Sequence, residues 1–141
     1  MISSRNLADL NSIVRRMAEG HIAACKAEGI DLLVTCTYRD AEEQERLYAQ
    51  GRTVKGSKVT NAKAGQSMHN YRLAYDVVPM RFGKPVWGTK GEDNILWQRV
   101  GAIGQAHGLE WAGSWKTFKE FPHFQYTGGH PLSFFQAGGT L

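Results

Sequence analysis

The chain has 141 residues, of which 42% are hydrophobic and 21% charged, and this is typical of one globular domain spanning residues 1–141. No apolar run approaches the roughly 20 residues of a membrane span, so stable membrane insertion is not expected. The formal charge of +4 and the pI of about 9.2 come from scattered basic residues, which argues against a nucleic-acid groove with clustered Lys and Arg. Mild basicity also suits a polyanionic cell envelope.

The first part of the chain is predicted to be mainly helical. Asn6 is a helix N-cap, and apolar residues recur at helical spacing as far as about Ala27. The β-rich run at residues 32–38 predicts a strand. Asp40 then caps a second helix, which ends at Gly51.

The second part of the chain predicts short strands around one more helix. Residues 51–66 are rich in Gly, Lys, Thr and Asn and are interpreted as a long surface loop, a kind of segment that is often functional or mobile. Helices first, followed by short strands interleaved with a helix, indicate an α+β fold. The predicted elements are strands at 74–79, about 109–111 and about 121–126, a helix at about 94–107, and a loop-like tail.

Two short segments, residues 67–76 and 120–125, carry most of the chemistry. They supply two imidazoles and a carboxylate, a donor set with which zinc keeps one position open for water. Two of the three residues share the first segment and the third comes from the second, so the side chains converge only in the folded chain. These candidate metal ligands are His69, Asp76 and His123.

A second carboxylate stands three residues before the later histidine. Glu120 and His123 would point to opposite faces of a regular strand, but a bend at Phe121-Pro122 would return Glu120 to the metal side. A carboxylate in that place can move protons while the metal acidifies water. Any one of these residues alone is more often an ordinary surface or core residue, whereas the whole constellation predicts metal-assisted hydrolysis.

The remaining cysteines and histidines are interpreted without a functional role. Cys25 and Cys36 lack a Cys-x-x-Cys spacing, and we expect two small core residues, with a disulfide or a metal role as the alternative. The histidines that we expect not to bind metal are His21, His107 and His130.

With these motifs in place, the chain resembles the zinc D-Ala-D-Ala carboxypeptidase and L-alanyl-D-glutamate endopeptidase family, and is most similar to its small phage endolysins. The family pattern is Ser-x-His-x-x-Gly-x-Ala-x-Asp, followed later by Glu or Asp-x-Pro-His-Phe. Its matches here are Ser67, His69, Ala74, Asp76, Glu120, Pro122, His123 and Phe124. Further matches are Tyr38, Arg39, Gln44, Leu47, Tyr48, Gly51 and Arg52, then the segments 108–111 and 113–115, so that the resemblance spans roughly residues 30–126.

The resemblance implies an α+β fold in which helices pack on a small, mainly antiparallel sheet carrying a zinc site, hedgehog/D,D-peptidase-like. It implies Zn²⁺ as the cofactor, with His69, Asp76 and His123 as its ligands. It also implies Glu120 as the catalytic carboxylate. One departure is Arg72, which replaces a glycine that would permit a positive φ or close packing.

Arg39 is implied to lie near the substrate. A guanidinium at a strand end can polarise a scissile carbonyl or hold a substrate carboxylate through two hydrogen bonds. The alternative is a structural ion pair with Asp40 or Glu43.

Three further residues are candidates for contact with the substrate. Ser67 can hydrogen-bond a ligand or the peptide, with a turn residue as the alternative. Gln44 is a candidate too, although a supporting or structural role behind the site is the favoured interpretation. Trp115 is a candidate platform, although Trp111 and Trp115 both also suit the core.

We therefore expect a monomeric zinc metallopeptidase acting on peptidoglycan stem peptides, with hydrolysis of the L-Ala–D-Glu bond for host cell-wall lysis. The N-terminus lacks the apolar stretch of a signal peptide. The expectation is thus an endolysin that is made in the cytoplasm and acts in the periplasm or cell wall after membrane breach. The alternatives are a D-Ala-D-Ala carboxypeptidase and a non-catalytic zinc-containing wall-binding module.

Overall fold

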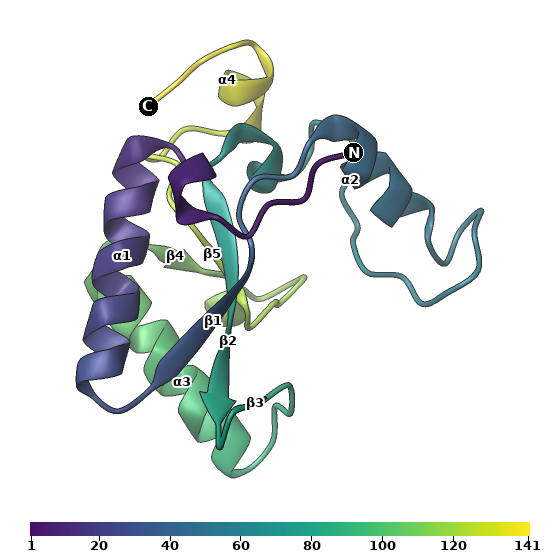
Figure 1. Ribbon diagram of the computed structural model, residues 1–141. Helices are drawn as coiled ribbons and strands as arrows, with labels where there is room; N and C mark the ends of the chain where they lie inside the picture. Colours follow the sequence, from purple (N-terminus) through teal and green to yellow (C-terminus); the bar gives the residue numbers. More distant parts are fainter.

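Five short strands form one antiparallel sheet at the centre of the structure, a computed structural model that describes residues 1–141 (Figure 1). The strands are ordered β1-β2-β5-β4, and β3 pairs with the end of β2. This arrangement, with helices packed on a small antiparallel sheet, confirms the predicted α+β class. The strands are β1 (Asp31–Cys36), β2 (Ala74–Arg81), β3 (Lys84–Pro85), β4 (Glu110–Trp111) and β5 (His123–Gln125).

Two long helices, α1 and α3, pack against one face of the sheet and against each other (Figure 1). None of the helices combines the length and the apolarity that crossing a bilayer requires. The α-helices are α1 (Ser12–Ala27), α2 (Ala41–Ala49), α3 (Glu92–Ala106) and α4 (Leu132–Gln136). The 3₁₀ helices are η1 (Leu7–Asp9), η2 (Met68–Tyr71) and η3 (Ala112–Ser114).

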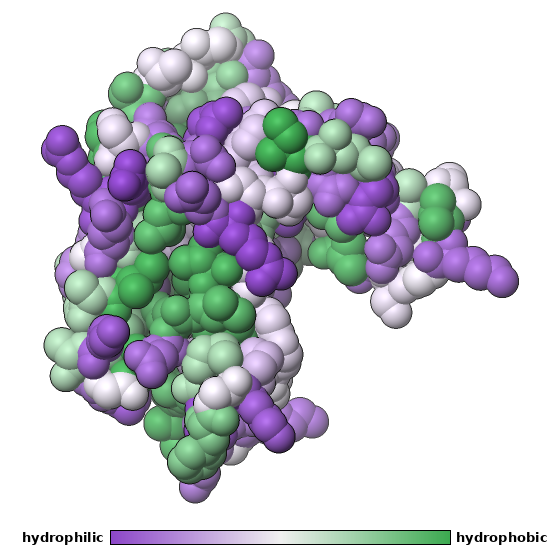
Figure 2. Space-filling view, viewed as in Figure 1, coloured by the Kyte–Doolittle hydropathy of each residue, from purple (hydrophilic) through white to green (hydrophobic).

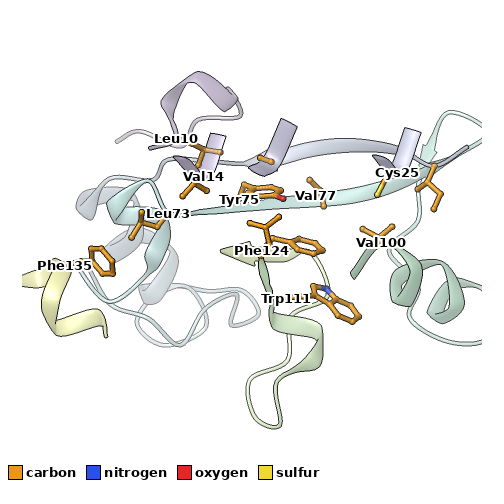
Figure 3. Close-up of a cluster of buried hydrophobic side chains, with 13 residues drawn as sticks. Leu10, Val14, Cys25, Leu73, Tyr75, Val77, Val100, Trp111, Phe124 and Phe135 are labelled. Carbon is orange, nitrogen blue, oxygen red and sulfur yellow. The ribbon is translucent and has the colours of Figure 1, made fainter. Parts of the chain in front are cut away.

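The hydrophobic core lies between the sheet and these two helices (Figure 3). Tyr75 and Val77 of β2 and Phe124 of β5 are fully buried there. Full burial of an apolar side chain stabilises the fold by roughly 1.5–3 kcal/mol. Because side chains alternate along a strand, Asp76 points to the opposite face, which α1 and α3 leave uncovered.

Helix α3 approaches the sheet closely because two of its residues lack a side chain. A Cβ at Gly101 would lie 2.3 Å from the indole of Trp111, and one at Gly104 would lie 2.5 Å from the ring of Phe124. Both distances are far below van der Waals contact. Glycine at these positions therefore sets the spacing between α3 and the strands that carry the site.

His21 is the one fully buried imidazole of α1, and it belongs to the core. Its Nε2–H donates to the carbonyl of Val100 at 2.9 Å, so its Nδ1 accepts from the hydroxyl of Tyr75 at 2.7 Å. Burial disfavours the charged ring and lowers the pKa of His21 to about 4. The ring is neutral and both of its nitrogens are hydrogen-bonded, which agrees with the expectation that His21 binds no metal.

The first predicted helix is interrupted, which corrects the sequence interpretation. Asn6 caps only the 3₁₀ helix η1, and Leu10 is extended with φ −79° and ψ 155°. A second cap follows, because the side chain of Asn11 accepts the N–H of Ile13 at 2.9 Å. The Asn11 N–H also donates to the carbonyl of Arg72 at 2.9 Å, which draws this turn away from a helical path.

Two boundaries near the C-terminus also differ from expectation. The tail contains the short helix α4, since Phe135 is buried against Tyr71 and anchors one turn. The last predicted strand, at about 121–126, is reduced to β5. A turn precedes it, in which the N–H of His123 donates to the carbonyl of Glu120 at 3.3 Å.

Helix α2 and the loop that follows it project to one side of the sheet (Figure 1). Asp40 caps α2 as predicted, accepting the N–H of Glu43 at 2.8 Å. The loop is held to α2 by side chains: Arg52 donates to the carbonyl of Thr60 at 3.0 Å, and Gln44 to that of Ala62 at 2.7 Å. The space-filling view shows the surface hollowed beneath α2 and this loop (Figure 2).

Candidate metal centre and active site

Three polar side chains lie in a row across the uncovered face of the sheet. Cys36 of β1 pairs in register with Asp76 of β2, and Asp76 pairs with His123 of β5. The pairing places Cys36 opposite Asp76 only because of an irregularity between Val34 and Cys36, where β1 contributes one extra residue. Directly paired residues point to the same face, so a thiol, a carboxylate and an imidazole share one patch.

The second imidazole comes from η2, the turn before β2. Ser67 caps this turn by accepting the N–H of His69 at 3.2 Å, while the side chain of Asn70 accepts the N–H of Ser67 at 3.2 Å. The backbone of His69 is also held by Arg39, whose N–H donates to its carbonyl at 3.2 Å. Caps and backbone contacts thus fix the position from which His69 faces the sheet.

Arg72 ends η2 in the left-handed region, with φ 64° and ψ 29°. The positive φ explains why the family pattern has glycine at this position, since a Cβ there costs roughly 1–2 kcal/mol. The Arg72 guanidinium stacks 3.9 Å above the ring of Tyr38 and donates to the carbonyl of Asp9 at 2.9 Å. These contacts offset the strain, and the turn carrying His69 is retained.

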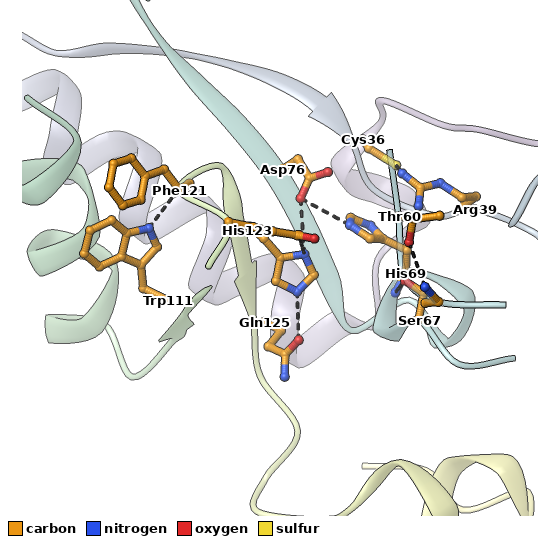
Figure 4. Close-up of polar contacts among 12 residues, drawn as sticks. Cys36, Arg39, Thr60, Ser67, His69, Asp76, Trp111, Phe121, His123 and Gln125 are labelled. Atoms are coloured by element: carbon orange, nitrogen blue, oxygen red, sulfur yellow. Dashed lines mark hydrogen bonds and ion pairs between the residues drawn. The ribbon is translucent and has the colours of Figure 1, made fainter. Parts of the chain in front are cut away.

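Both imidazoles direct one nitrogen at the same oxygen of Asp76 (Figure 4). His69 Nε2 lies 3.2 Å from Asp76 Oδ1, and His123 Nδ1 lies 3.3 Å from that atom. A tetrahedral zinc with bonds of about 2.0–2.1 Å needs ligand atoms about 3.3 Å apart. Both imidazole-to-carboxylate distances match this spacing, and the three residues are those that the sequence predicts as ligands.

The opposite nitrogen of each ring is already engaged. His69 Nδ1–H donates to the carbonyl of Thr37 at 2.8 Å, and His123 Nε2–H donates to Gln125 Oε1 at 2.8 Å. Each bond selects the tautomer whose remaining nitrogen carries a lone pair toward Asp76. Two lone pairs and a carboxylate facing one point repel one another unless a cation lies between them.

The pKa values of the site without metal show in the same way that it favours positive charge. Burial opposes the imidazolium of His69, but the charge and hydrogen bond of Asp76, with a contribution from Cys36, raise its pKa to about 10. Burial likewise opposes the carboxylate of Asp76, yet His69 and His123 hold its pKa well below the usual range. Protons here supply the positive charge that a bound divalent metal would supply at such a donor set.

Glu120 lies at the edge of this group, on the cavity side. Its Oε2 is 3.8 Å from His123 Nδ1, and its side chain is 53% exposed. The turn before β5 returns Glu120 to the side of His123, as the bend at Phe121-Pro122 predicts. An exposed carboxylate beside the metal donors is placed to exchange protons with water or substrate.

Arg39 lines the same cavity and is held from behind. Its Nη1 donates to Gln44 Oε1 at 3.1 Å and its Nη2 to Cys36 Sγ at 3.5 Å, while its Nε is buried without a hydrogen-bond partner. No ion pair joins Arg39 to Asp40 or Glu43, so the alternative structural role is not formed. Gln44 is fully buried and does not line the cavity. Its position supports Arg39 and the following loop, and this corrects the expectation of direct contact with substrate.

The three candidate metal ligands, Glu120 and Arg39 line a cavity of about 790 Å³. Trp115 lies on its wall with its ring centroid 5.8 Å from that of His123, and Ser67 also lines it. Trp111 is buried in the core, where its Nε1–H donates to the carbonyl of Phe121 at 2.8 Å. The loop 51–66 supplies part of the wall through Val59, Thr60, Ala62 and Gln66.

Two residues of the site were not identified from the sequence. Gln125 is two positions after His123 in a strand, so the period of two was a usable indication that they share a face. Both cysteines are free and buried, as expected, but only Cys25 belongs to the main hydrophobic cluster, whereas Cys36 lies beside the site. The Cys36 sulfur and donor atoms of His69 and Asp76 lie within 4.8 Å of one another. Burial opposes ionisation of the Cys36 thiol, but His69 and Arg39 lower its pKa.

The chain is similar to known peptidases. The peptidase M15 model described as D-alanyl-D-alanine carboxypeptidase matches residues 60–126. Peptidoglycan L-alanyl-D-glutamate endopeptidase CwlK of Bacillus subtilis is 40% identical over 123 residues, covering 84% of this chain and 74% of that protein. The chain belongs to the M15 peptidase family. The family predicted from the motifs is therefore confirmed.

Solved structures share the M15 fold at lower identity. The L-Ala D-Glu endopeptidase ChiX of Serratia marcescens has a TM-score of 0.62 and 21% identity, with 89% of each chain covered. The LD-carboxypeptidase LdcB has a TM-score of 0.67 and 20% identity, covering 92% of this chain and 64% of that one. VanYB, solved with D-alanine-D-alanine, has a TM-score of 0.63 and 15% identity, covering 92% of this chain and 78% of that one. Proteins that share this fold are thus named for different specificities.

Proposed function

We propose that this M15 peptidase is a zinc-dependent endopeptidase that hydrolyses the L-Ala–D-Glu bond of peptidoglycan stem peptides. The observation that carries the proposal is the convergence of two imidazole lone pairs and the Asp76 carboxylate beside Glu120, at the floor of an open cavity. The choice of bond is supported by the 40% identity to CwlK, which is named for that cleavage.

The chain's own residues account for binding and proton transfer. His69, Asp76 and His123 hold the ion, and Zn²⁺ bound there supplies an acidified water and polarises the scissile carbonyl. Glu120 accepts a proton from the attacking water and delivers it to the leaving amine of D-Glu. Arg39 binds a substrate carboxylate or carbonyl, since it lines the cavity and Gln44 orients its guanidinium.

The test is digestion of a defined disaccharide–tetrapeptide, with products identified by mass spectrometry, before and after chelation and after zinc is restored. The proposal expects cleavage between L-Ala and D-Glu that chelator abolishes and zinc recovers. Glu120→Gln is the matched control, because it keeps the side-chain shape and removes the proton-accepting charge. Cleavage that persists in chelator, or in Glu120→Gln, contradicts the assigned chemistry.

Two other functions give different products in the same experiment. The matching family model is described as a D-alanyl-D-alanine carboxypeptidase. Such an enzyme would release only a terminal D-Ala from a pentapeptide substrate. A non-catalytic wall-binding module would bind peptidoglycan without cleaving it. The exposed Glu120 beside the metal donors favours an enzyme over such a module.

The cellular part of the proposal is host-wall lysis by a monomeric endolysin that is made in the cytoplasm and acts on the wall after membrane breach. Its support is the similarity of the sequence motifs to small phage endolysins. Cells that produce the protein should remain intact until the membrane is permeabilised and should then lyse, whereas cells producing Glu120→Gln should not. Lysis that needs no membrane breach would contradict this part of the proposal.

A further inference from the structure

The cavity has two unlike walls. One wall comes from the end of β1, the 51–66 loop and the turn before β2, and it carries the cation of Arg39 with polar groups. The facing side comes from the segments after β3 and after β4, and it is rich in aromatic rings. The aromatic residues of that side are Trp87, Trp97, Trp115 and Phe121.

Trp87 differs from the other rings because it is 54% exposed while its neighbours in the chain are fixed. The N–H of Val86 donates to the carbonyl of Pro79 at 2.9 Å, and the Val86 side chain is buried. Trp97 Nε1–H donates to the carbonyl of Gly88 at 2.9 Å. A further bond, from Asn94 Nδ2 to the carbonyl of Thr89 at 3.1 Å, holds the next residue.

A large aromatic ring held in solvent by an anchored backbone is pre-organised for stacking. Ordering of a loop on binding costs free energy, and this segment is already ordered by its own hydrogen bonds. The ring lines the same cavity as the metal donors, so its ligand is part of the molecule that occupies the active site.

The charges of the cavity orient the substrate. D-Glu, on the carboxyl side of the scissile bond, carries the anionic groups, and Arg39 is the cation that protein contacts hold in place. Lys119, on the aromatic side, is exposed and makes no hydrogen bond or ion pair, so it is the less organised of the two cations. The amino side of the bond then lies toward the aromatic residues. In peptidoglycan, the group that follows L-Ala in that direction is the lactyl ether of N-acetylmuramic acid.

We propose that Trp87 is the platform of a sugar subsite, on which the N-acetylmuramic acid ring stacks while its stem peptide occupies the metal centre. The inference rests on the proposed endopeptidase function. It adds that the enzyme recognises the glycan next to the bond it cleaves. The C–H face of the sugar packs on the indole, which is a large, rigid apolar surface.

The first test compares two soluble substrates, a disaccharide–tetrapeptide and the same tetrapeptide without sugar. The wild-type protein should have a KM for the sugar-bearing substrate lower by roughly three- to tenfold. Trp87→Ala should bring the ratio of the two KM values close to one, with Trp87→Phe in between. Phe82→Ala is the matched control, because Phe82 is 96% exposed at the β2–β3 turn and does not line the cavity, so it should keep the wild-type ratio.

The second measurement does not require hydrolysis. The indole N–H resonance of Trp87, assigned by its loss in Trp87→Phe, should shift when the reduced disaccharide is titrated into the zinc-loaded protein. Wild-type KM values that are equal for the two substrates, or a Trp87→Ala effect that is equal on both, would overturn the sugar subsite. Absence of L-Ala–D-Glu cleavage with either substrate would overturn the proposed function, and the titration would still report whether Trp87 binds sugar.

Discussion

Replacing Gln125 with alanine is predicted to weaken zinc binding while leaving the fold in place. In the structure, Gln125 Oε1 accepts the Nε2–H of His123 at 2.8 Å, and both side chains are buried. Truncation removes the acceptor, and leaving a buried donor unpaired costs about 1–3 kcal/mol. This range corresponds to the roughly 10–100-fold loss of metal affinity that follows removal of a ligand's hydrogen-bond partner.

The assay is competition for zinc with a chromogenic chelator at neutral pH, on the wild-type protein, Gln125→Ala and Gln125→Glu. The glutamate retains an acceptor and makes the imidazole a stronger donor to metal, so Gln125→Glu should bind zinc at least as tightly as wild type. Thermal unfolding of the chelator-treated proteins reports the fold separately. Unchanged zinc affinity in Gln125→Ala, or equal losses in both variants, would refute the role assigned to this hydrogen bond.

Four other predictions follow from the geometry. Glu120→Gln should lower kcat by roughly 10²–10⁴-fold at unchanged zinc content, and a small effect would mean that another group moves the proton. Arg39→Lys keeps the charge but loses the planar fork, so activity should fall with little change in Tm; a large drop in Tm with turnover retained would favour a structural role. Arg72→Gly should be more stable than Arg72→Ala by about 1 kcal/mol in urea unfolding, because φ is 64° there, and the reverse order would exclude strain. Burial lowers the pKa of His21 from 6.5 to about 4, so the unfolded chain binds this proton first and stability is lost as pH falls through that window. In chelator-treated protein, the stability advantage of wild type over His21→Phe should therefore shrink by about 3 kcal/mol between pH 7 and pH 4, whereas a constant difference would contradict the buried neutral ring.

Local signals in the sequence predict the elements that carry the site. The strand around Asp76 and the cap at Asp40 require only neighbouring residues, and both are present in the structure. The bend before His123 was likewise indicated by Pro122. These features depend on backbone preferences and on the period of the strand, which a single sequence displays.

Features that depend on distant partners were not predictable in the same way. Cys36 enters the site because β1 gains one residue relative to β2, and no local pattern marks that change of register. The break at Leu10 depends on an N–H bond from Asn11 to the carbonyl of Arg72, more than 60 residues away in sequence. The apolar spacing continues across the break, and a periodicity argument therefore joins two helices into one.

The catalytic floor and the walls of the cavity have different structural origins. On the floor, Asp76 and His123 lie on hydrogen-bonded strands, where a change of one position would move a side chain to the other face, and His69 lies on the capped turn η2. The walls are chiefly the segments 51–66 and 112–119, which contain no strand of the sheet. Insertions or exchanges in these two segments can therefore reshape the groove without moving the metal donors. Exchanging these wall segments is therefore the change that we expect to alter bond specificity while the metal donors stay in place.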